Sequence, residues 1–311
     1  MILLKYTRYC LFGESISRVF FTNKIQVDMA IKLSIWGARG SIPAPGPSTV
    51  RIGGNTTCVE VNVNNKTHVI IDAGTGVRPL GQQIFKSKDI KNLTLLLTHS
   101  HWDHLSGFTF FAPAFDPDST INVYGNLMAQ EVLQRDIIER NDNRYSPVNM
   151  DNLRAKLIFH KELPCPLVID DLKITALNLN HPGNGFAYRF EHDEHSFVFI
   201  TDNEIGMEYK GGHKPEELVD FCQGANLMIH DAQYLPSEIK AHHGWGHSTY
   251  EEVIDIARKA AVPHVVLTHH DPERTDEECT LLLEQARAYI SKNQSKIWCE
   301  LAVEGGVFNL G

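Results

Sequence analysis

Short apolar runs separated by Gly, Asn and Asp recur along the chain, and this pattern predicts strands. We expect strands at residues 31–37, 56–63, 67–74, 93–99, 121–125, 172–180, 185–191, 196–202, 227–233 and 264–270. Stretches of helical periodicity predict helices at residues 76–86, 127–141, 214–222, 249–261 and 276–294. In the fourth helix Val253, Ile256 and Ala257 share one face with Ala260, and Ser248 or Thr249 can cap its start. Alternating strands and helices indicate a layered α/β fold.

The first 28 residues differ from the rest of the chain. They are mildly apolar but broken by charges such as Lys5 and Arg8, and they lack the order of a signal peptide. Met29 directly precedes the first convincing strand. We therefore expect residues 1–28 to be a poorly packed extension, or a segment that is present only because the sequence is read from an upstream start codon. Residues 29–311 are expected to form a single domain.

Composition narrows the class of protein. Lys and Arg number 29 and Asp and Glu 38, so the net charge is -9 and the surface disfavours nucleic acid at long range. No apolar run reaches the roughly 18 residues that a membrane span needs, so we expect a cytoplasmic protein that does not cross a membrane. The six cysteines are far apart and form no CxxC pair, which predicts reduced, mostly buried thiols.

Histidines and aspartates gather where apolar runs end. In the segment 95–107, LLLTHSHWDHLSG, His99 and His101 are two apart and can face one ion from an extended chain, and Asp103 and His104 follow after a bend. Further along, the ends of other apolar runs carry His181, Asp202, His230 and His269. Because strand ends meet at one edge of an α/β sheet, these side chains are expected to converge. Imidazole and carboxylate are ligands for zinc and similar ions.

The motif HxHxDH begins at His99, and a single His, Asp and His follow it further along the chain. With this pattern the chain resembles the metallo-β-lactamase superfamily from about Ile31 to Leu310. The segment IIDAGTG, with Asp72, fits the same resemblance. It implies a four-layer αββα sandwich of two similar halves with the site at one edge. It further implies two Zn²⁺ ions, with Mn²⁺ or Fe left open. The ligands implied for the first ion are His99, His101 and His181, those for the second are Asp103, His104 and His269, and Asp202 bridges them.

Two further motifs are similar to those of the ribonuclease Z-like phosphodiesterase branch. GWGHST contains His247, and MIHDAQY contains Asp231 where that branch often has Glu. The resulting hypothesis is a dinuclear-zinc metallohydrolase in which a hydroxide shared by two metal ions attacks phosphorus. Asp103 would help to orient the hydroxide, His247 would contact a phosphoryl oxygen or protonate the leaving group, and Asp231 would fix the tautomer of His247.

The sequence favours a small anionic substrate, such as a cyclic phosphodiester or nucleotide. A long Gly/Pro-rich arm that could grip transfer RNA is missing from the sequence, and the net charge is negative, so transfer RNA is disfavoured. One alternative is a hydrolase of lactones, thioesters or lactams with the same metal site. Another is a non-catalytic metal-binding scaffold. A homodimer is common in the superfamily, but no interface signal stands out here.

Several segments are candidates for the rim of the site. Residues 130–159 predict an amphipathic helix plus loop, or a lid whose basic and aromatic residues meet an anionic ligand. Those residues are Arg135, Arg140, Arg144, Arg154 and Tyr145. The Gly/Pro-rich loop 37–57 offers Arg39, Arg51 and Asn55 as substrate contacts. A second wall would contain His242, His243 and Trp245, and His270 would support the ligands from behind.

Overall fold

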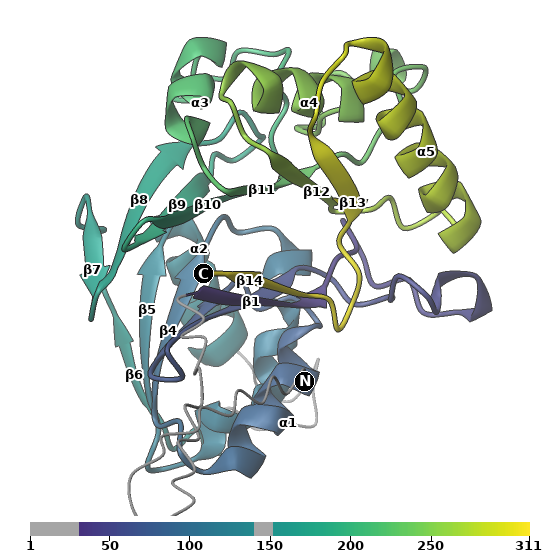
Figure 1. The fold of residues 1–311 in the computed structure, drawn as a ribbon. Helices are drawn as coiled ribbons and strands as arrows, with labels where there is room; N and C mark the ends of the chain where they lie inside the picture. Colours follow the sequence, from purple (N-terminus) through teal and green to yellow (C-terminus); the bar gives the residue numbers. More distant parts are fainter. Residues whose placement is uncertain (1–30, 140–151) are drawn as a thin grey trace, which may run out of the picture.

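The computed structural model describes residues 31–139 and 152–311, and within them the chain forms two seven-stranded sheets stacked face to face (Figure 1). The first sheet has the order β14-β1-β2-β3-β4-β5-β6. Its strands are Val307–Leu310, Ile31–Gly37, Cys58–Val63, Thr67–Ile71, Asn92–Leu97, Thr120–Gly125 and Lys156–Phe159. The second sheet has the order β13-β12-β11-β10-β9-β8-β7. Its strands are Trp298–Leu301, His264–Thr268, Leu227–Asp231, His195–Ile200, Phe186–His192, Leu172–Asn178 and Leu167–Ile169.

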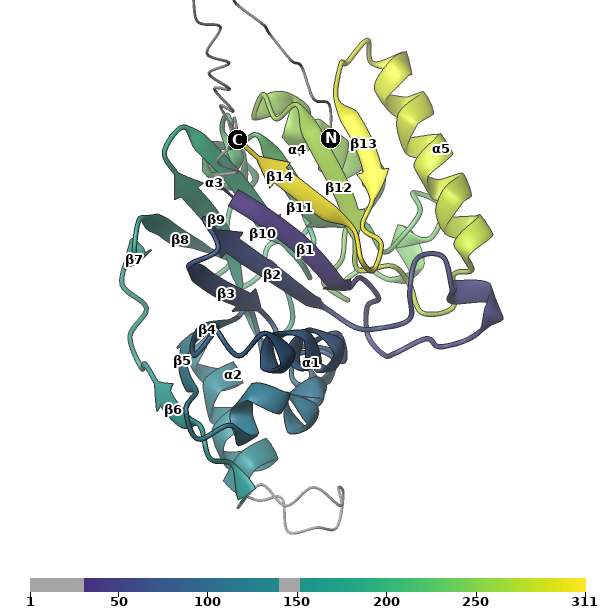
Figure 2. The same cartoon turned by 60° about the horizontal axis from the view of Figure 1, so that its bottom comes forward.

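Helices cover the outer face of each sheet, which makes four layers (Figures 1 and 2). On the first sheet lie α1 and α2, at Val77–Ser87 and Leu127–Glu131, and the chain continues from α2 as a π-helical stretch, Val132–Glu139. On the second sheet lie α3, α4 and α5, at Pro215–Cys222, Tyr250–Lys259 and Asp276–Lys292. The expected αββα sandwich is confirmed. None of the helices in the described ranges is long and apolar enough to span a membrane.

The two sheets repeat one pairing pattern, which confirms the two similar halves. Starting from β14, three antiparallel pairs are followed by three parallel pairs. Starting from β7, the second sheet shows the same succession. In each half the parallel strands therefore end at a common edge, which is where side chains from different strands can meet.

The core lies in three apolar layers. Between the sheets, β-branched and aromatic side chains interlock, including Phe190 and Phe197, whose rings stack 4.4 Å apart. Outside the second sheet, α4 buries the predicted apolar face, and Thr249 caps the helix in a reciprocal pair with Glu252. Outside the first sheet, α1 buries its own apolar side chains, such as Leu80. These layers hold both sheets rigidly, so the strand ends are fixed relative to each other.

The strand predictions and four of the five helix predictions are confirmed, while the helix predicted at residues 127–141 is α-helical only to Glu131, continues as a π-helix to Glu139 and then leaves the described residues. The sequence reading missed four short strands: β6, β7, β13 and β14. Each has three or four residues, and all lie at or next to a sheet edge. The description of residues 130–159 as helix plus loop is wrong at its end, where β6 extends the first sheet in parallel with β5. Residues 1–28 and the side chains Arg140, Arg144 and Tyr145 lie outside the described residues.

Candidate metal centre

The seven side chains implied as metal ligands come from the ends of strands in both sheets. His99, His101, Asp103 and His104 follow β4 in the first sheet. In the second sheet His181 follows β8, Asp202 follows β10 and His269 follows β12. The structure brings the seven together in two groups, and within each group the candidate ligand atoms lie within 4.8 Å of one another. One group is His99, His101, His181 and Asp202; the other is Asp103, His104 and His269.

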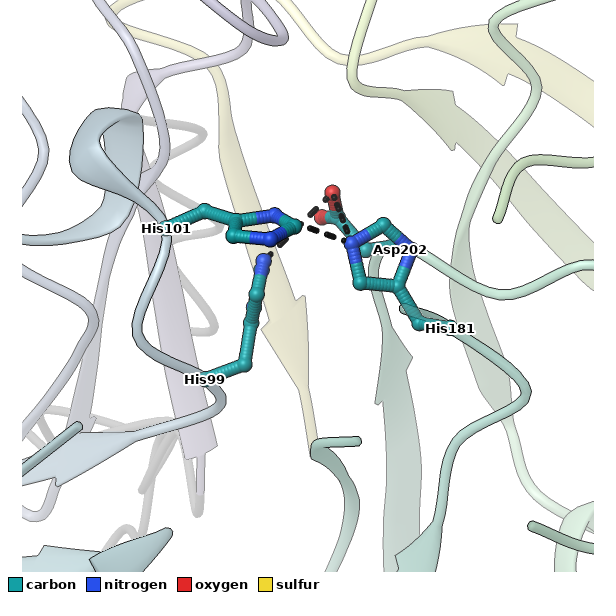
Figure 3. A group of neighbouring side chains, drawn as sticks. All are labelled: His99, His101, His181 and Asp202. Carbon is teal, nitrogen blue, oxygen red and sulfur yellow. Dashed lines mark hydrogen bonds and ion pairs between the residues drawn. The ribbon is translucent and has the colours of Figure 1, made fainter. Parts of the chain in front are cut away.

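Asp202 lies between the two groups, and its two oxygens face different histidines. Its Oδ1 lies 3.7 Å from Nε2 of His99 and 3.7 Å from Nε2 of His181 (Figure 3). Its Oδ2 lies 3.2 Å from Nε2 of His104 and 3.3 Å from Nε2 of His269. Asp202 therefore joins the two groups of candidate ligands.

Distances between the donor atoms fit a metal site. Tetrahedral zinc with bonds of about 2.0–2.1 Å requires ligand atoms about 3.3–3.4 Å apart. Nδ1 of His101 lies 3.0 Å from Nε2 of His181, and Oδ2 of Asp103 lies 3.2 Å from His104 and 3.3 Å from His269. Among the described residues, Nε2 of His99 and of His104 are buried without a hydrogen-bond partner. Buried nitrogens in this state are costly unless something binds them, so the donor set suits a metal ion.

Contacts behind the histidines fix which nitrogen faces the centre. His104 Nδ1 donates to Oδ2 of Asp72 at 2.7 Å, and His99 Nδ1 donates to the Thr98 hydroxyl at 3.1 Å. The Thr98 hydroxyl in turn donates to Asp72. On the other side, the backbone carbonyl of Gly246 accepts from His181 Nδ1 and the Gln233 amide oxygen accepts from His269 Nδ1. Since each Nδ1 carries the proton, the Nε2 lone pairs of these four histidines are left free for a cation.

The charges at the centre also suit a cation. Burial lowers the pKa of His99 and of His101, and it lowers the pKa of His181 to about 4, so these rings are neutral and able to ligate. Burial opposes a charge on His104 as well, but the carboxylates of Asp103, Asp202 and Asp72 raise its pKa well above the usual value. The carboxylates therefore attract positive charge, and a metal ion can take the place of the proton.

His247 and Asp231 lie beside this centre. His247 Nδ1 donates to Oδ2 of Asp231 at 3.2 Å, so the shorter aspartate does reach the ring. The backbone N–H of Ser248 donates to the same oxygen. The His247 ring stacks against that of His269, with centroids 4.9 Å apart. Asp202, His247 and His269 also form a group that could hold a metal, so His247 adjoins the candidate ligands Asp202 and His269.

The backbone of the loop after β1 contacts two side chains of the second ligand group, Asp103 and His269. The N–H of Ser41 donates to Oδ2 of Asp103 at 2.8 Å. A Cβ atom on Gly40 would lie 2.3 Å from the His269 ring, so the chain can pass this ligand only with glycine at position 40. The sequence reading placed this loop at the rim, but it did not anticipate a backbone contact to a ligand.

Arg39 was predicted to touch substrate, and that prediction is wrong. Its side chain is fully buried and donates to the carbonyls of Gly53 and Arg274, with Asp276 at 3.5 Å. Arg39 therefore anchors the loop 37–57 to the start of α5. The side chains of the other two candidates from this loop have protein partners: Arg51 pairs with Glu277, and Asn55 donates to Glu304. For Arg51 and Asn55, contact with substrate stays a prediction.

Two further histidines do not join the centre as expected. His230 was expected to converge with the ligands, but it is in none of the three groups, and its Nδ1 instead contacts the backbone carbonyl of Asp231 at 2.7 Å. His270 was expected to support the ligands, but its Nε2 donates to the carbonyl of Ala302, which joins it to the end of β13. His269 lies beyond the end of β12 and has φ of 57°, so the chain turns there and His270 does not continue its direction.

The predicted wall at residues 242–245 is a stack of rings. Tyr234 stacks on His242 at 4.2 Å, and Trp245 packs edge-on against His242 at 5.0 Å. Trp245 is 59% exposed and lies two residues before His247. Its contact with substrate stays a prediction, as does the lid role of the described residues Arg135 and Arg154.

An αββα sandwich with a buried His/Asp cluster at its strand ends defines a metal-dependent hydrolase of the metallo-β-lactamase fold. The family described as the beta-lactamase superfamily domain matches residues 67–270, and the chain belongs to this family. Ribonuclease Z of Methanopyrus kandleri is 27% identical over 236 residues, covering 68% of this chain and 81% of its own.

Solved structures share the fold. The metallo-beta-lactamase fold protein YhfI from Bacillus subtilis superposes with a TM-score of 0.62 at 18% identity, covering 90% of this chain and 99% of its own. A diphosphatase from the PhnP family gives the same TM-score and identity, with coverage of 90% and 98%. At this level of identity the two structures support the fold, and the chemistry has to be argued from the residues.

Proposed function

We propose that this chain is a dinuclear-zinc phosphodiesterase that acts on a small, anionic phosphodiester such as a cyclic nucleotide. The observation that carries the proposal is Asp202, whose two oxygens each face a separate set of donors, 3.7 Å from His99 and 3.2 Å from His104. Mn²⁺ or Fe in place of zinc remains compatible with the same imidazole and carboxylate donors.

Each ligand has a defined place in the proposal. The first ion would be held by His99, His101 and His181, the second by Asp103, His104 and His269, and Asp202 would be shared. When bound, two such cations lower the pKa of water and neutralise charge that develops on phosphoryl oxygens. Asp103 also receives the N–H of Ser41, which fixes the direction of its carboxylate.

His247 is the group we assign to proton transfer. Because its Nδ1 donates to Asp231, its Nε2 is the atom free to act on substrate. From there it can donate a hydrogen bond to a phosphoryl oxygen or a proton to the leaving oxygen. Asp231 is fully buried, and burial would raise its pKa, but hydrogen bonds from His230 and His247 lower it, so the carboxylate stays charged and holds the ring.

The choice of a phosphodiester rests on this His–Asp pair and on the sequence relatives. The pair resembles the motifs of the ribonuclease Z-like branch, and ribonuclease Z of Methanopyrus kandleri is similar over most of its length. A small substrate is favoured over transfer RNA because the net charge is -9 and the sequence carries no long Gly/Pro-rich arm. A homodimer stays a prediction.

A substrate panel tests the proposal. Purified protein with measured metal content is assayed on bis-p-nitrophenyl phosphate and cyclic nucleotides, and in parallel on lactones, thioesters and lactams. Turnover of phosphodiesters alone supports the proposal, and turnover of the carboxyl substrates alone favours the second enzyme class. Metal-loaded protein that is inert on both panels would favour a binding scaffold.

The role of His247 has its own test. His247→Ala is expected to lower turnover of a cyclic nucleotide, whose leaving oxygen needs a proton, by about 10²–10⁴-fold, the usual contribution of a positioned acid or base, while metal content stays full. A variant that keeps full turnover contradicts the assignment of proton transfer to His247.

A further inference from the structure

Glu204 is a buried carboxylate two residues after Asp202, and four donors converge on it. Its side chain is 1% exposed. The backbone N–H of Gly244 lies 3.0 Å from Oε1, and that of Gly246 lies 2.9 Å from Oε2. His243 Nδ1 donates to Oε1 at 2.8 Å, and the Tyr209 hydroxyl donates to Oε2 at 2.9 Å. A carboxylate with this many partners fixes the conformation of the segments that supply them.

The loop 243–247 is folded around this carboxylate. Gly244 and Gly246 have φ values of 86° and 87°, which point their N–H groups to the same side. Such concave runs of N–H groups bind anions, and here the anion is a side chain of the protein itself. The Glu204 side chain accepts from all four of its hydrogen-bond partners, an arrangement that suits a carboxylate.

The same loop contacts two functional groups. The carbonyl of Gly246 accepts from His181 Nδ1 at 2.9 Å. A Cβ atom on Gly246 would lie 1.9 Å from that nitrogen, so the loop is in tight contact with the ligand. The next residue is His247, whose ring reaches Asp231. A shift of the loop would therefore move a ligand and the proposed proton donor together.

The residues on either side of Glu204 are held just as firmly. The backbone N–H of Glu204 donates to the carbonyl of Asn180, the residue before His181. Asn203 accepts the N–H of Asn180 and the Nε2 proton of His213. The segment from Asp202 to Glu204 thus begins at the metal centre and ends at the loop 243–247, on a backbone that cannot move freely.

We propose that Glu204 is a positioning residue of the active site: by holding the loop 243–247 it orients both His181 and His247. The proposal rests on the function proposed above for His247 and His181. The hydrogen bonds of the Glu204 side chain go to Tyr209, His243, Gly244 and Gly246, and none of these four is an implied metal ligand. It acts through the loop, and the neutral amide of Gln cannot replace it because an amide offers one acceptor atom in place of two.

Hydrogen exchange tests the structural step directly. In Glu204→Gln, the amides of residues 243–247 are expected to exchange about 10- to 100-fold faster than in the wild type, because hydrogen bonds to a charged group are lost. Glu278→Gln is the matched control, because Glu278 also accepts a backbone N–H but does so at the start of α5. Exchange at residues 243–247 should stay at the wild-type rate in this control. Unchanged exchange at residues 243–247 in Glu204→Gln overturns the proposal.

The catalytic step is read from two substrates with different leaving groups. p-Nitrophenolate leaves readily without a proton, whereas the alkoxide of a cyclic nucleotide needs one. Glu204→Gln is therefore expected to lower kcat at least about 10-fold more on the cyclic nucleotide than on bis-p-nitrophenyl phosphate. The double variant with His247→Ala should lose little more than His247→Ala alone. The proposal is overturned if Glu204→Gln lowers kcat equally on both substrates and if its effect adds fully to that of His247→Ala in the double variant.

Two measurements keep the outcome clear. If Glu204→Gln does not fold, Tyr209→Phe removes one donor and is expected to change exchange and kcat in the same direction by a smaller factor. If the wild type hydrolyses no phosphodiester, the proposed function fails. The role of Glu204 is then still decided by two measurements on Glu204→Gln. These are hydrogen exchange at residues 243–247 and metal affinity in a chelator competition, which should be weaker than in the wild type because His181 is less well oriented.

Discussion

Asp72 offers a sharp test of how the centre is built, because one carboxylate supports the histidines of both groups. Its Oδ2 accepts from His104 Nδ1 and from the Thr98 hydroxyl, both at 2.7 Å, and that hydroxyl accepts from His99. Asp72→Asn removes the charge and keeps the shape. Asp72 has φ of 59°, a left-handed conformation that Asn also tolerates, so the substitution adds no backbone strain.

The expected size of the effect follows from these contacts. Asn can still accept the Thr98 N–H and can donate to the Thr98 hydroxyl, so the direct contact to His104 is the one that is lost. A hydrogen bond to a charged group contributes about 1.5–3 kcal/mol. Loss of such a contact behind a metal-bound histidine costs about 10- to 100-fold in metal affinity, which corresponds to about 1.4–2.7 kcal/mol. The two magnitudes agree.

The assay is competition with a chromogenic chelator, which reports the affinity of each bound equivalent. We expect the ion held by His104 to bind 10- to 100-fold more weakly, as estimated above, and the other ion to change less. Glu60→Gln is the control, because Glu60 is also a buried carboxylate that pairs with a histidine, His68, in the same sheet. Equal weakening of both ions, or none, refutes the account of Asp72.

Three other predictions concern the loop, the metal and the thiols. Gly40→Ala places a Cβ atom 2.3 Å from the buried His269 ring, so the melting temperature of the metal-free protein, the metal affinity and turnover should all fall; an unchanged melting temperature with equal metal affinity contradicts the contact. Removal of metal with EDTA should lower the free energy of unfolding, by about 2.7 kcal/mol if free metal had stood at 100 times its Kd, and calorimetry that shows no shift contradicts a metal bound to the native state. Burial raises the pKa of Cys222 and of Cys299 to about 12, so both stay protonated at pH 8 and iodoacetamide should label exposed Cys165 before either of them; early labelling of Cys222, read by mass spectrometry, would contradict the packing.

The sequence located the long strands and the polar residues at their ends for a physical reason, whereas the αββα layers and the ligand assignments came from the family resemblance. Strands buried on both faces read as long apolar runs, and polar residues at their ends stand out against them. His99, Asp202 and His269 each follow such a run and meet at the shared edge of the sheets. The short strands at the sheet edges, such as β13 and β14, gave no comparable signal, because they are only four residues long and partly exposed.

The contacts that orient the ligands were harder to predict. Backbone groups such as the Gly246 carbonyl and the Ser41 N–H have no side-chain signature. Gln233 and Glu204 were visible next to Asp231 and Asp202, but only the folded chain shows which atoms they reach. Arg39 misled the reading because an arginine in a Gly/Pro-rich loop suggests a ligand contact, whereas here it is fully buried as an anchor.

The central claim is that two cations, shared through Asp202, make this chain a phosphodiesterase. The most direct measurement is a metal titration of the metal-free protein, in which bound zinc and turnover of bis-p-nitrophenyl phosphate are recorded together. We predict saturation at two equivalents per chain, with most of the turnover appearing as the second ion binds. Saturation at one equivalent, or two bound equivalents without any turnover of phosphodiesters, would contradict the account.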